Sequence, residues 1–340
     1  MAVELDDYDR ANRLAATMVQ TSRKTRDRGL QADVQARAKQ AQEMRSAFNA
    51  AKPALAKLEA DAANAPANAA WGRYVAWVKD NWDEGLPLLA KGGDDVAAIA
   101  ARELAGPKTP DAQVPLADDW SETAQGEKGQ RQRSIEEHAC RWYERAAGEL
   151  PPADRQAVLK KIERSFGNTA IHELDTAGSG IELGGAEANI GPEATIEFWA
   201  YTQARDVPLL TKRQREDDQS LTFYMSGGQV SLISDGPYQR FDIRDASSAP
   251  IDDGRWHHVA AVKRGKSLWL MVDGRLAGSG EGLELFRSQS PWILGVHRPW
   301  NNSQGQGRFC RVRLSTIARY RPPFKPDRTY ERDQYTAWMR

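Results

Sequence analysis

The sequence predicts two domains of different class: an α-helical repeat domain over residues 1–165, followed by an antiparallel β-sandwich of the jelly-roll kind over residues 168–340. Two observations support this prediction. The N-terminal half is rich in alanine, and its apolar residues recur at helical spacing. From about residue 168, apolar and polar residues alternate in short runs separated by glycine-rich turns, as in antiparallel strands.

The composition fits two soluble domains and excludes several functions. The chain has 340 residues, enough for two domains that each bury a core. Its 47 Lys and Arg residues balance its 47 Asp and Glu residues, so no overall field favours nucleic acid as a partner. No apolar run reaches the roughly 20 residues that span a bilayer, and we expect no membrane insertion. We expect Cys140 and Cys310, in different domains, to be small buried side chains.

Local signals divide the first domain into several helices. Pro53 predicts a kink or break within the helical pattern of residues 36–58, because proline cannot donate a backbone hydrogen bond. Asn68 is a candidate cap for a helix that runs to about Asn81. The polar residues 124–132 predict a loop between paired helices.

The tryptophans of this domain have two possible roles. The simpler prediction is that they pack between helices, and they are Trp71, Trp77, Trp82, Trp120 and Trp142. The alternative is a concave groove that binds a peptide, as in repeat scaffolds.

The helical half resembles known repeat modules. The order small, aromatic, small and then proline resembles the second helix of a tetratricopeptide (TPR) or Sel1-type repeat, at Ala139, Tyr143, Ala146 and Pro151. The stretches 78–92, 116–120 and 142–146 are similar to a helical module of large planctomycete proteins, which usually precedes a sandwich domain. No biochemical role carries over from that module, and we expect the helices to act as a scaffold or spacer.

One hairpin is the clearest feature of the second domain. Residues 252–260 predict a polar turn that leads into a strand, and residues 268–274 predict its partner, which ends in Asp273-Gly274. Asp-Gly is favoured where both turn residues need positive φ. The other predicted strands are 180–183, 194–201, 209–210, 221–225, 230–233, 241–243, 292–295 and 307–314.

The order of these runs resembles a laminin-G-like, concanavalin A-like jelly roll of the bacterial type. The matching pieces are Thr195–Trp199, Asp253–Ala260, Leu270–Gly274, Leu294-Gly295, Gly307–Ser315 and Ala318–Tyr320. The resemblance implies a non-catalytic domain that binds carbohydrate or a protein surface. It also favours a periplasmic or cell-surface location, although the acidic residues 1–10 do not resemble a secretory signal.

Two possible catalytic features are weak. His257 and His258 are adjacent on a predicted strand and therefore point to opposite faces, so they cannot bind one metal ion together. We expect a packed His258 that bonds a neighbouring strand and an outward His257. A glycosidase needs paired carboxylates, but Glu182 and Glu197 fall on separate strands. With no nucleophile elbow or phosphate loop either, we expect no enzyme.

Loops of the sandwich supply the candidate ligand site. Aromatic rings stack on sugars, and guanidinium and amide groups bond hydroxyls. The candidate ligand residues are Tyr238, His297, Arg298, Trp300, Asn301 and Asn302, whereas we expect Trp292 to belong to the core.

No cofactor is required, but relatives with this fold suggest one structural calcium ion. The candidate ligands of that ion are Asp235, Asp252, Asn301 and Asn302. The alternative is that these are turn residues that bond their own backbone.

Three functions remain open from the sequence. The first is a binding protein whose sandwich recognises a glycan or a protein surface while the helices act as a scaffold. The second is a structural or adhesion module of a longer chain, which contacts other domains of that chain and binds no small ligand. The third is a divergent glycoside hydrolase.

Overall fold

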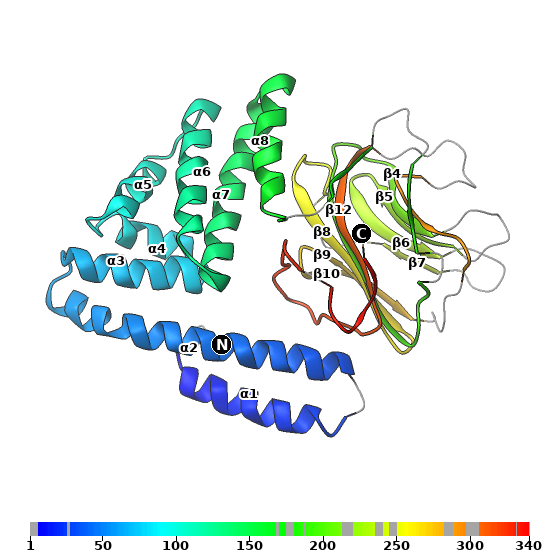
Figure 1. The fold of residues 1–340 in the computed structure, drawn as a ribbon, viewed down its shortest axis with the longest axis horizontal. Coiled ribbons are helices and arrows are strands. Elements are labelled where there is room, and N and C mark those ends of the chain that lie inside the picture. The colour runs from blue at the N-terminus through cyan, green and yellow to red at the C-terminus, as the bar shows by residue number, and fades with distance from the viewer. Residues whose placement is uncertain are drawn as a thin grey trace. The chain divides into compact units, whose positions relative to one another are not determined.

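The computed structural model describes residues 6–25, 28–167, 170–174, 180–185, 188–212, 220–234, 241–244, 250–281, 288–296, 306–330 and 332–339. Met1–Arg26 and Val34–Ser165 belong to one compact unit, and Phe166–Arg340 belong to the other. The first unit is helical and the second is a two-sheet sandwich (Figure 1). The predicted fold class is confirmed.

Eight α-helices and one π-helical turn make up the described part of the first unit. They are α1 (Tyr8–Ser22), α2 (Arg28–Ala60), α3 (Ala65–Arg73), η1 (Tyr74–Val78), α4 (Trp82–Leu89), α5 (Asp95–Leu104), α6 (Pro110–Gln125), α7 (Gly129–Glu149) and α8 (Pro152–Arg164).

The predicted cap of α3 is wrong. The helix starts four residues earlier, after Asn64, whose side chain accepts a hydrogen bond from the backbone N–H of Ala67 (3.1 Å). Pro66 lies in the first turn of α3, where a missing N–H costs nothing, so it favours this start. Asn68 is buried within the helix and donates its amide to the carbonyl oxygens of Ala62 and Asn64.

Of the kink or break predicted at Pro53, the break does not occur, because α2 continues through this residue to its end. Phe48 and Ala51, which precede the proline, both pack on the core of the unit. This packing offsets the single backbone hydrogen bond that proline cannot make. The predicted loop 124–132 is shorter than expected, since only residues 126–128 separate α6 from α7.

The tryptophans pack as predicted. Trp77, Trp82, Trp120 and Trp142 are buried, and Trp71 packs against an aromatic cluster of Tyr8, Phe48 and Tyr74. The hydroxyls of the two tyrosines lie 2.6 Å apart, which joins α1 to η1. Helix α4 crosses η1 so closely that a Cβ at Gly85 would lie 2.6 Å from the Cβ of Ala76, so this position requires glycine.

The second unit consists of two antiparallel sheets. The first sheet has the order β1 (His172–Leu174), β12 (Gly307–Ser315), β3 (Glu193–Tyr201), β8 (Trp256–Arg264), β9 (Ser267–Val272) and β10 (Arg275–Glu281), with β13 (Thr336–Met339) also paired to β12. The second sheet has the order β2 (Ile181–Gly184), β11 (Trp292–Leu294), β4 (Val207–Lys212), β5 (Leu221–Ser226), β6 (Gln229–Ser234) and β7 (Phe241–Arg244).

The core lies between the two sheets. Phe198 and Phe309 of the first sheet and Phe223 of the second are fully buried there, and the rings of Phe198 and Phe223 meet edge to face at 5.2 Å. Trp292 belongs to this core, as predicted. Cys140 and Cys310 are both free and buried, which confirms the prediction for the cysteines.

The predicted hairpin is also confirmed. Strands β8 and β9 pair along their length, and Asp273 and Gly274 form the next turn with φ of 48° and 74°. A Cβ at Gly274 would lie 1.8 Å from the carbonyl oxygen of Phe324, and the N–H of Phe324 donates to the carbonyl of Gly274 (3.0 Å). This turn therefore also holds the chain that follows β12.

Candidate functional site

Connections between strands meet at one end of the sandwich, which we call the rim (residues 202–206, 227–228, 250–255, 273–274 and 306). Backbone hydrogen bonds join these loops: Gly228 donates to Arg205 (2.9 Å), and Gly254 donates to Thr202 (3.1 Å). The hydroxyl of Thr202 donates to the carbonyl of Gln306, which directly precedes β12 (2.5 Å). The polar side chains exposed at the rim are Gln203, Arg205, Asp206, Asp253, Arg255, Asp273 and Gln306.

The six candidate ligand residues lie outside the described residues, but the strands show where their connections start and end. Tyr238 follows β6. The C-terminal ends of β6 and β4 lie at the same end of the second sheet. His297–Asn302 follow β11, which runs antiparallel to β4 toward the start of that strand. This connection rejoins the described chain at Gln306 on the rim, whereas the connection with Tyr238 leaves the opposite end of the sheet.

Asp252 is the one predicted calcium ligand that the structure describes, since Asp235, Asn301 and Asn302 lie outside it. Its carboxylate lies 3.0 Å from the guanidinium of Arg205, and its side chain is 18% exposed. Arg205 also donates to the carbonyl of Gly227 (3.0 Å), so it ties two rim loops together. A calcium ion at Asp252 would have to compete with this ion pair.

His257 lies between two carboxylates of the rim. Its Nε2 is 2.9 Å from Asp253 and its Nδ1 is 2.8 Å from Asp273. Burial alone would lower the pKa of His257, but the hydrogen bonds and charges of the two aspartates raise it to about 9. The predicted outward position is only partly correct, because the side chain is 14% exposed and links the loop before β8 to the turn after β9.

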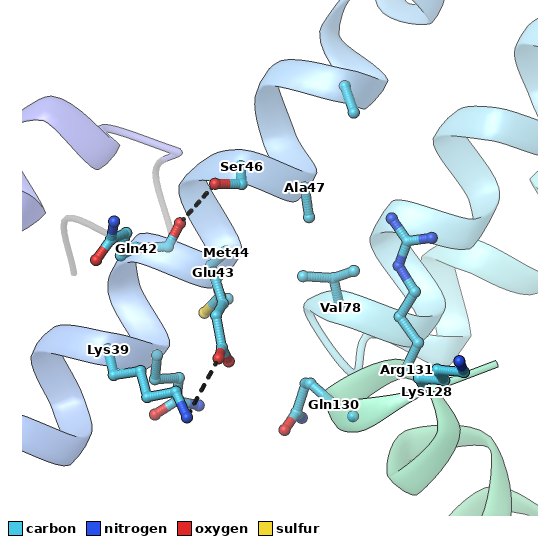
Figure 2. Close-up of a pocket in the computed structure, with 13 residues that line it drawn as sticks. Lys39, Gln42, Glu43, Met44, Ser46, Ala47, Val78, Lys128, Gln130 and Arg131 are labelled. Carbon is cyan, nitrogen blue, oxygen red and sulfur yellow. Dashed lines mark hydrogen bonds and ion pairs between the residues drawn. The ribbon is translucent and has the colours of Figure 1, made fainter.

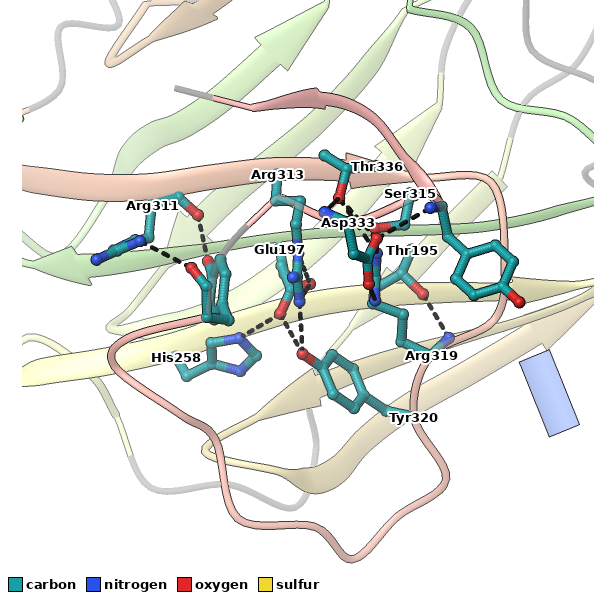
Figure 3. A network of polar contacts seen from close by, with 12 residues as sticks. Thr195, Glu197, His258, Arg311, Arg313, Ser315, Arg319, Tyr320, Asp333 and Thr336 are labelled. Carbon is teal, nitrogen blue, oxygen red and sulfur yellow. Dashed lines mark hydrogen bonds and ion pairs between the residues drawn. The ribbon is translucent and has the colours of Figure 1, made fainter. Parts of the chain in front are cut away.

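His258, the next residue, lies on the opposite face of β8 in a fully buried polar cluster (Figure 3). Glu197 of β3 accepts hydrogen bonds from His258 Nε2 (3.0 Å), Arg313 Nε (2.8 Å) and the Tyr320 hydroxyl (2.7 Å). Burial opposes the charge of Glu197, but the charge of Arg313 and these hydrogen bonds outweigh it and lower its pKa to about 2. The prediction that His258 bonds a neighbouring strand is confirmed.

The chain after β12 covers this cluster. We call residues 316–330 the C-terminal cover. Tyr320 and Phe324 of the cover stack at 4.0 Å and pack with Ala318 on the outward face of the first sheet. Tyr330 lies under the guanidinium of Arg313 (4.0 Å), and Arg311 donates to its carbonyl (2.7 Å).

A bidentate ion pair holds the outer margin of the cover. Arg319 donates to both carboxylate oxygens of Asp333 at 2.8 and 2.7 Å (Figure 3). The hydrogen bonds from Arg319 hold the pKa of Asp333 well below its usual range.

The cluster is therefore closed to ligands, while the rim is open. Glu197 and His258 are 0% exposed, so neither can reach a substrate in this conformation. The sequence contained part of a signal for the cluster, because Glu197 lies between apolar residues of a predicted strand, but only the structure pairs it with Arg313 across β3 and β12. No group of three metal-binding side chains occurs among the described residues.

Comparison with known proteins supports the identity of the sandwich. A laminin G family model, described as the concanavalin A-like lectin/glucanases superfamily, matches residues 175–321. The resemblance inferred from the strand motifs is confirmed over this range. The description includes both binding proteins and hydrolases, so it does not by itself choose between them.

Several solved structures are similar to part of this chain at low identity. Domains LG4-5 of the mouse laminin alpha1 chain are 13% identical, with 46% of this chain and 44% of that chain covered and a TM-score of 0.37. The Ruminococcus gnavus IT-sialidase CBM40, bound to alpha2,3 sialyllactose, is 15% identical, with 42% and 89% covered and a TM-score of 0.34. A putative carbohydrate binding protein from Bacteroides ovatus is 14% identical, with 51% and 48% covered and a TM-score of 0.35.

The chain thus spans less than half of the laminin structure. No curated protein sequence matches it. Among the described helices, none is both long and apolar enough to cross a membrane.

Proposed function

We propose that the sandwich is a non-catalytic module that binds a carbohydrate at the rim. The site combines Gln203, Arg255 and neighbouring rim residues with the predicted ligand residues His297–Asn302. Amide and guanidinium groups bond sugar hydroxyls, and Trp300 would supply a stacking face. The observation that carries the proposal is the contrast in access: the polar rim is exposed, whereas the cover closes the outward face of the first sheet.

The other functional assignments are part of the same proposal. The helical unit would act as a scaffold of the TPR-like kind, and the protein would work outside the cytoplasm. The binding would not require calcium, because Arg205 already neutralises Asp252. A protein surface is the second candidate ligand for the rim, as in an adhesion module of a longer chain, because its mixed charges also suit a protein interface.

A glycan array probed with the full chain tests the proposal, once with calcium and once with chelator. We expect Trp300→Ala to weaken binding about tenfold or more, because an aromatic face is lost. Gln203→Ala should have a smaller effect of the same sign. Tyr238→Ala is the matched control, since its connection leaves the opposite end of the second sheet, and it should bind normally.

Two results would contradict the proposal. Absence of glycan binding in both conditions would favour the protein-surface alternative. Loss of binding with Tyr238→Ala but not with Trp300→Ala would place the site at the other end of the sheet.

A further inference from the structure

A groove of about 690 Å³ opens on the helical unit between α2 and the start of α7 (Figure 2). Its floor is apolar and consists of Met44, Ala47 and Ala50 of α2 together with Val78 at the end of η1. Ala50 is exposed to solvent, so the floor is accessible.

The residues of the floor pack on buried residues of the helical unit. Met44 and Ala47 pack against the buried residues Tyr8, Tyr74 and Val78. η1 is a single π-helical turn, a feature that often occurs at functional sites. The groove is therefore preformed, and a partner would not have to order it.

The charge around the floor is biased. The lining residues include three cations, Lys39, Lys128 and Arg131, and one anion, Glu43. Ion pairs one helical turn apart join Lys39 to Glu43 (3.9 Å) and Arg131 to Glu127 (3.7 Å), so the local excess is one positive charge. The whole chain, in contrast, has equal numbers of basic and acidic residues. Electrostatic complementarity therefore favours a partner with acidic residues beside its apolar face.

We propose that this groove binds one face of an acidic amphipathic helix from a partner protein. The stretch of α2 from Lys39 to Ala50 extends for about 16 Å, which matches roughly three turns of a second helix. Apolar residues at helical spacing would lie on the floor, and flanking carboxylates would meet Lys128 and compete with Glu43 for Lys39. Single-stranded nucleic acid fits less well, because none of the described lining residues is aromatic and bases would have nothing to stack on.

The test is fluorescence anisotropy of the full chain with synthetic labelled helices roughly five turns long. The probe has leucines along one face and glutamates beside them. Two matched peptides replace either the glutamates by lysine or the leucines by serine. We expect the probe to bind at least about tenfold more tightly than either matched peptide, because each lacks one of the two complementary features.

Variants of the chain locate the contact. Ala50→Glu puts a carboxylate on the floor, and the double variant Lys39→Glu with Lys128→Glu reverses the charge of the margin. Both should weaken binding of the probe about tenfold. Lys57→Glu is the control, since it reverses one charge on an exposed residue of α2 outside the groove, and it should bind as the unchanged chain does.

Three outcomes would overturn the proposal. Equal binding of the glutamate and lysine peptides would remove the charge argument, and equal binding of the serine peptide would reduce the contact to ionic attraction. Tighter binding of a labelled single-stranded RNA, lost in the double variant, would assign the groove to nucleic acid. Circular dichroism of each variant confirms that the helices are intact.

Discussion

The adjacent histidines of β8 occupy opposite kinds of site. His258 is fully buried against an ionised Glu197, Arg313 and two tyrosines, under the C-terminal cover. His257, on the other face, bridges two aspartates that are 39% and 48% exposed at the rim. One residue step along a strand therefore separates a closed structural cluster from an open, titratable one.

The two sites differ in how far water can reach their charged groups. Around Glu197 water is excluded, so every charge depends on its protein partner and loss of one partner is costly. Around His257 water screens the aspartates, so the same kinds of contact are weaker and depend on pH and salt. Three substitutions test this contrast, from the largest expected effect to the smallest.

Glu197→Gln should have the largest effect. It leaves the Arg313 guanidinium buried without a counter-charge, and we expect a loss of about 3–5 kcal/mol in the free energy of unfolding of the sandwich. Urea unfolding, followed by near-ultraviolet circular dichroism, measures this loss.

Glu182→Gln is the control, because this glutamate is exposed on β2, and it should change stability by less than about 0.5 kcal/mol. A Glu197 variant as stable as the control would mean that the cluster does not hold the cover in place. Replacing Glu197 and Arg313 together by apolar residues should cost less than Glu197→Gln alone, since no charge is then left unpaired.

His257→Asn should have an intermediate, pH-dependent effect. The folded-state pKa of His257 is about 9, above its ordinary 6.5. Its contribution to stability is therefore fully present below about pH 6.5 and is lost as the pH rises through about 9. After allowance for solvent screening of the aspartates, we expect the variant to be about 1–2 kcal/mol less stable at pH 6.

Unfolding curves of both proteins across the alkaline range test this prediction. The difference between them should disappear by about pH 10. A constant difference at every pH would show that His257 acts through packing and not through its charge.

Asp333→Asn should have the smallest effect. The pair with Arg319 is bidentate, but the aspartate side chain is 42% exposed. We expect a loss of at most about 1 kcal/mol, and less at high salt, because water and ions screen an exposed pair. Thermal unfolding at low and high salt measures this loss of stability. An effect as large as that of Glu197→Gln would mean that the Arg319–Asp333 pair holds the cover as strongly as the buried cluster does.

Part of this picture was predictable. The change at residue 165 from helical to alternating periodicity predicted the fold class, and strand alternation predicted that the two histidines point apart. The helix details at Pro53 and Asn68 could not be predicted, because packing around Phe48 and capping by Asn64 overrode the local preference of single residues. The hairpin predicted from the sequence brings Asp253 and Asp273 near His257, but only the structure shows that His257 turns toward both carboxylates.

The sequence by itself determined the class of each unit, the hairpin with its Asp273-Gly274 turn and the burial of Trp292, because periodicity and turn chemistry are local. Only the tertiary structure decided that Glu197, His258 and Arg313 share one buried cluster and that the C-terminal cover closes it. It also decided that the connections containing Tyr238 and His297–Asn302 leave the second sheet from different ends. Each of these depends on strand order and direction, which are set by packing between segments far apart in the chain.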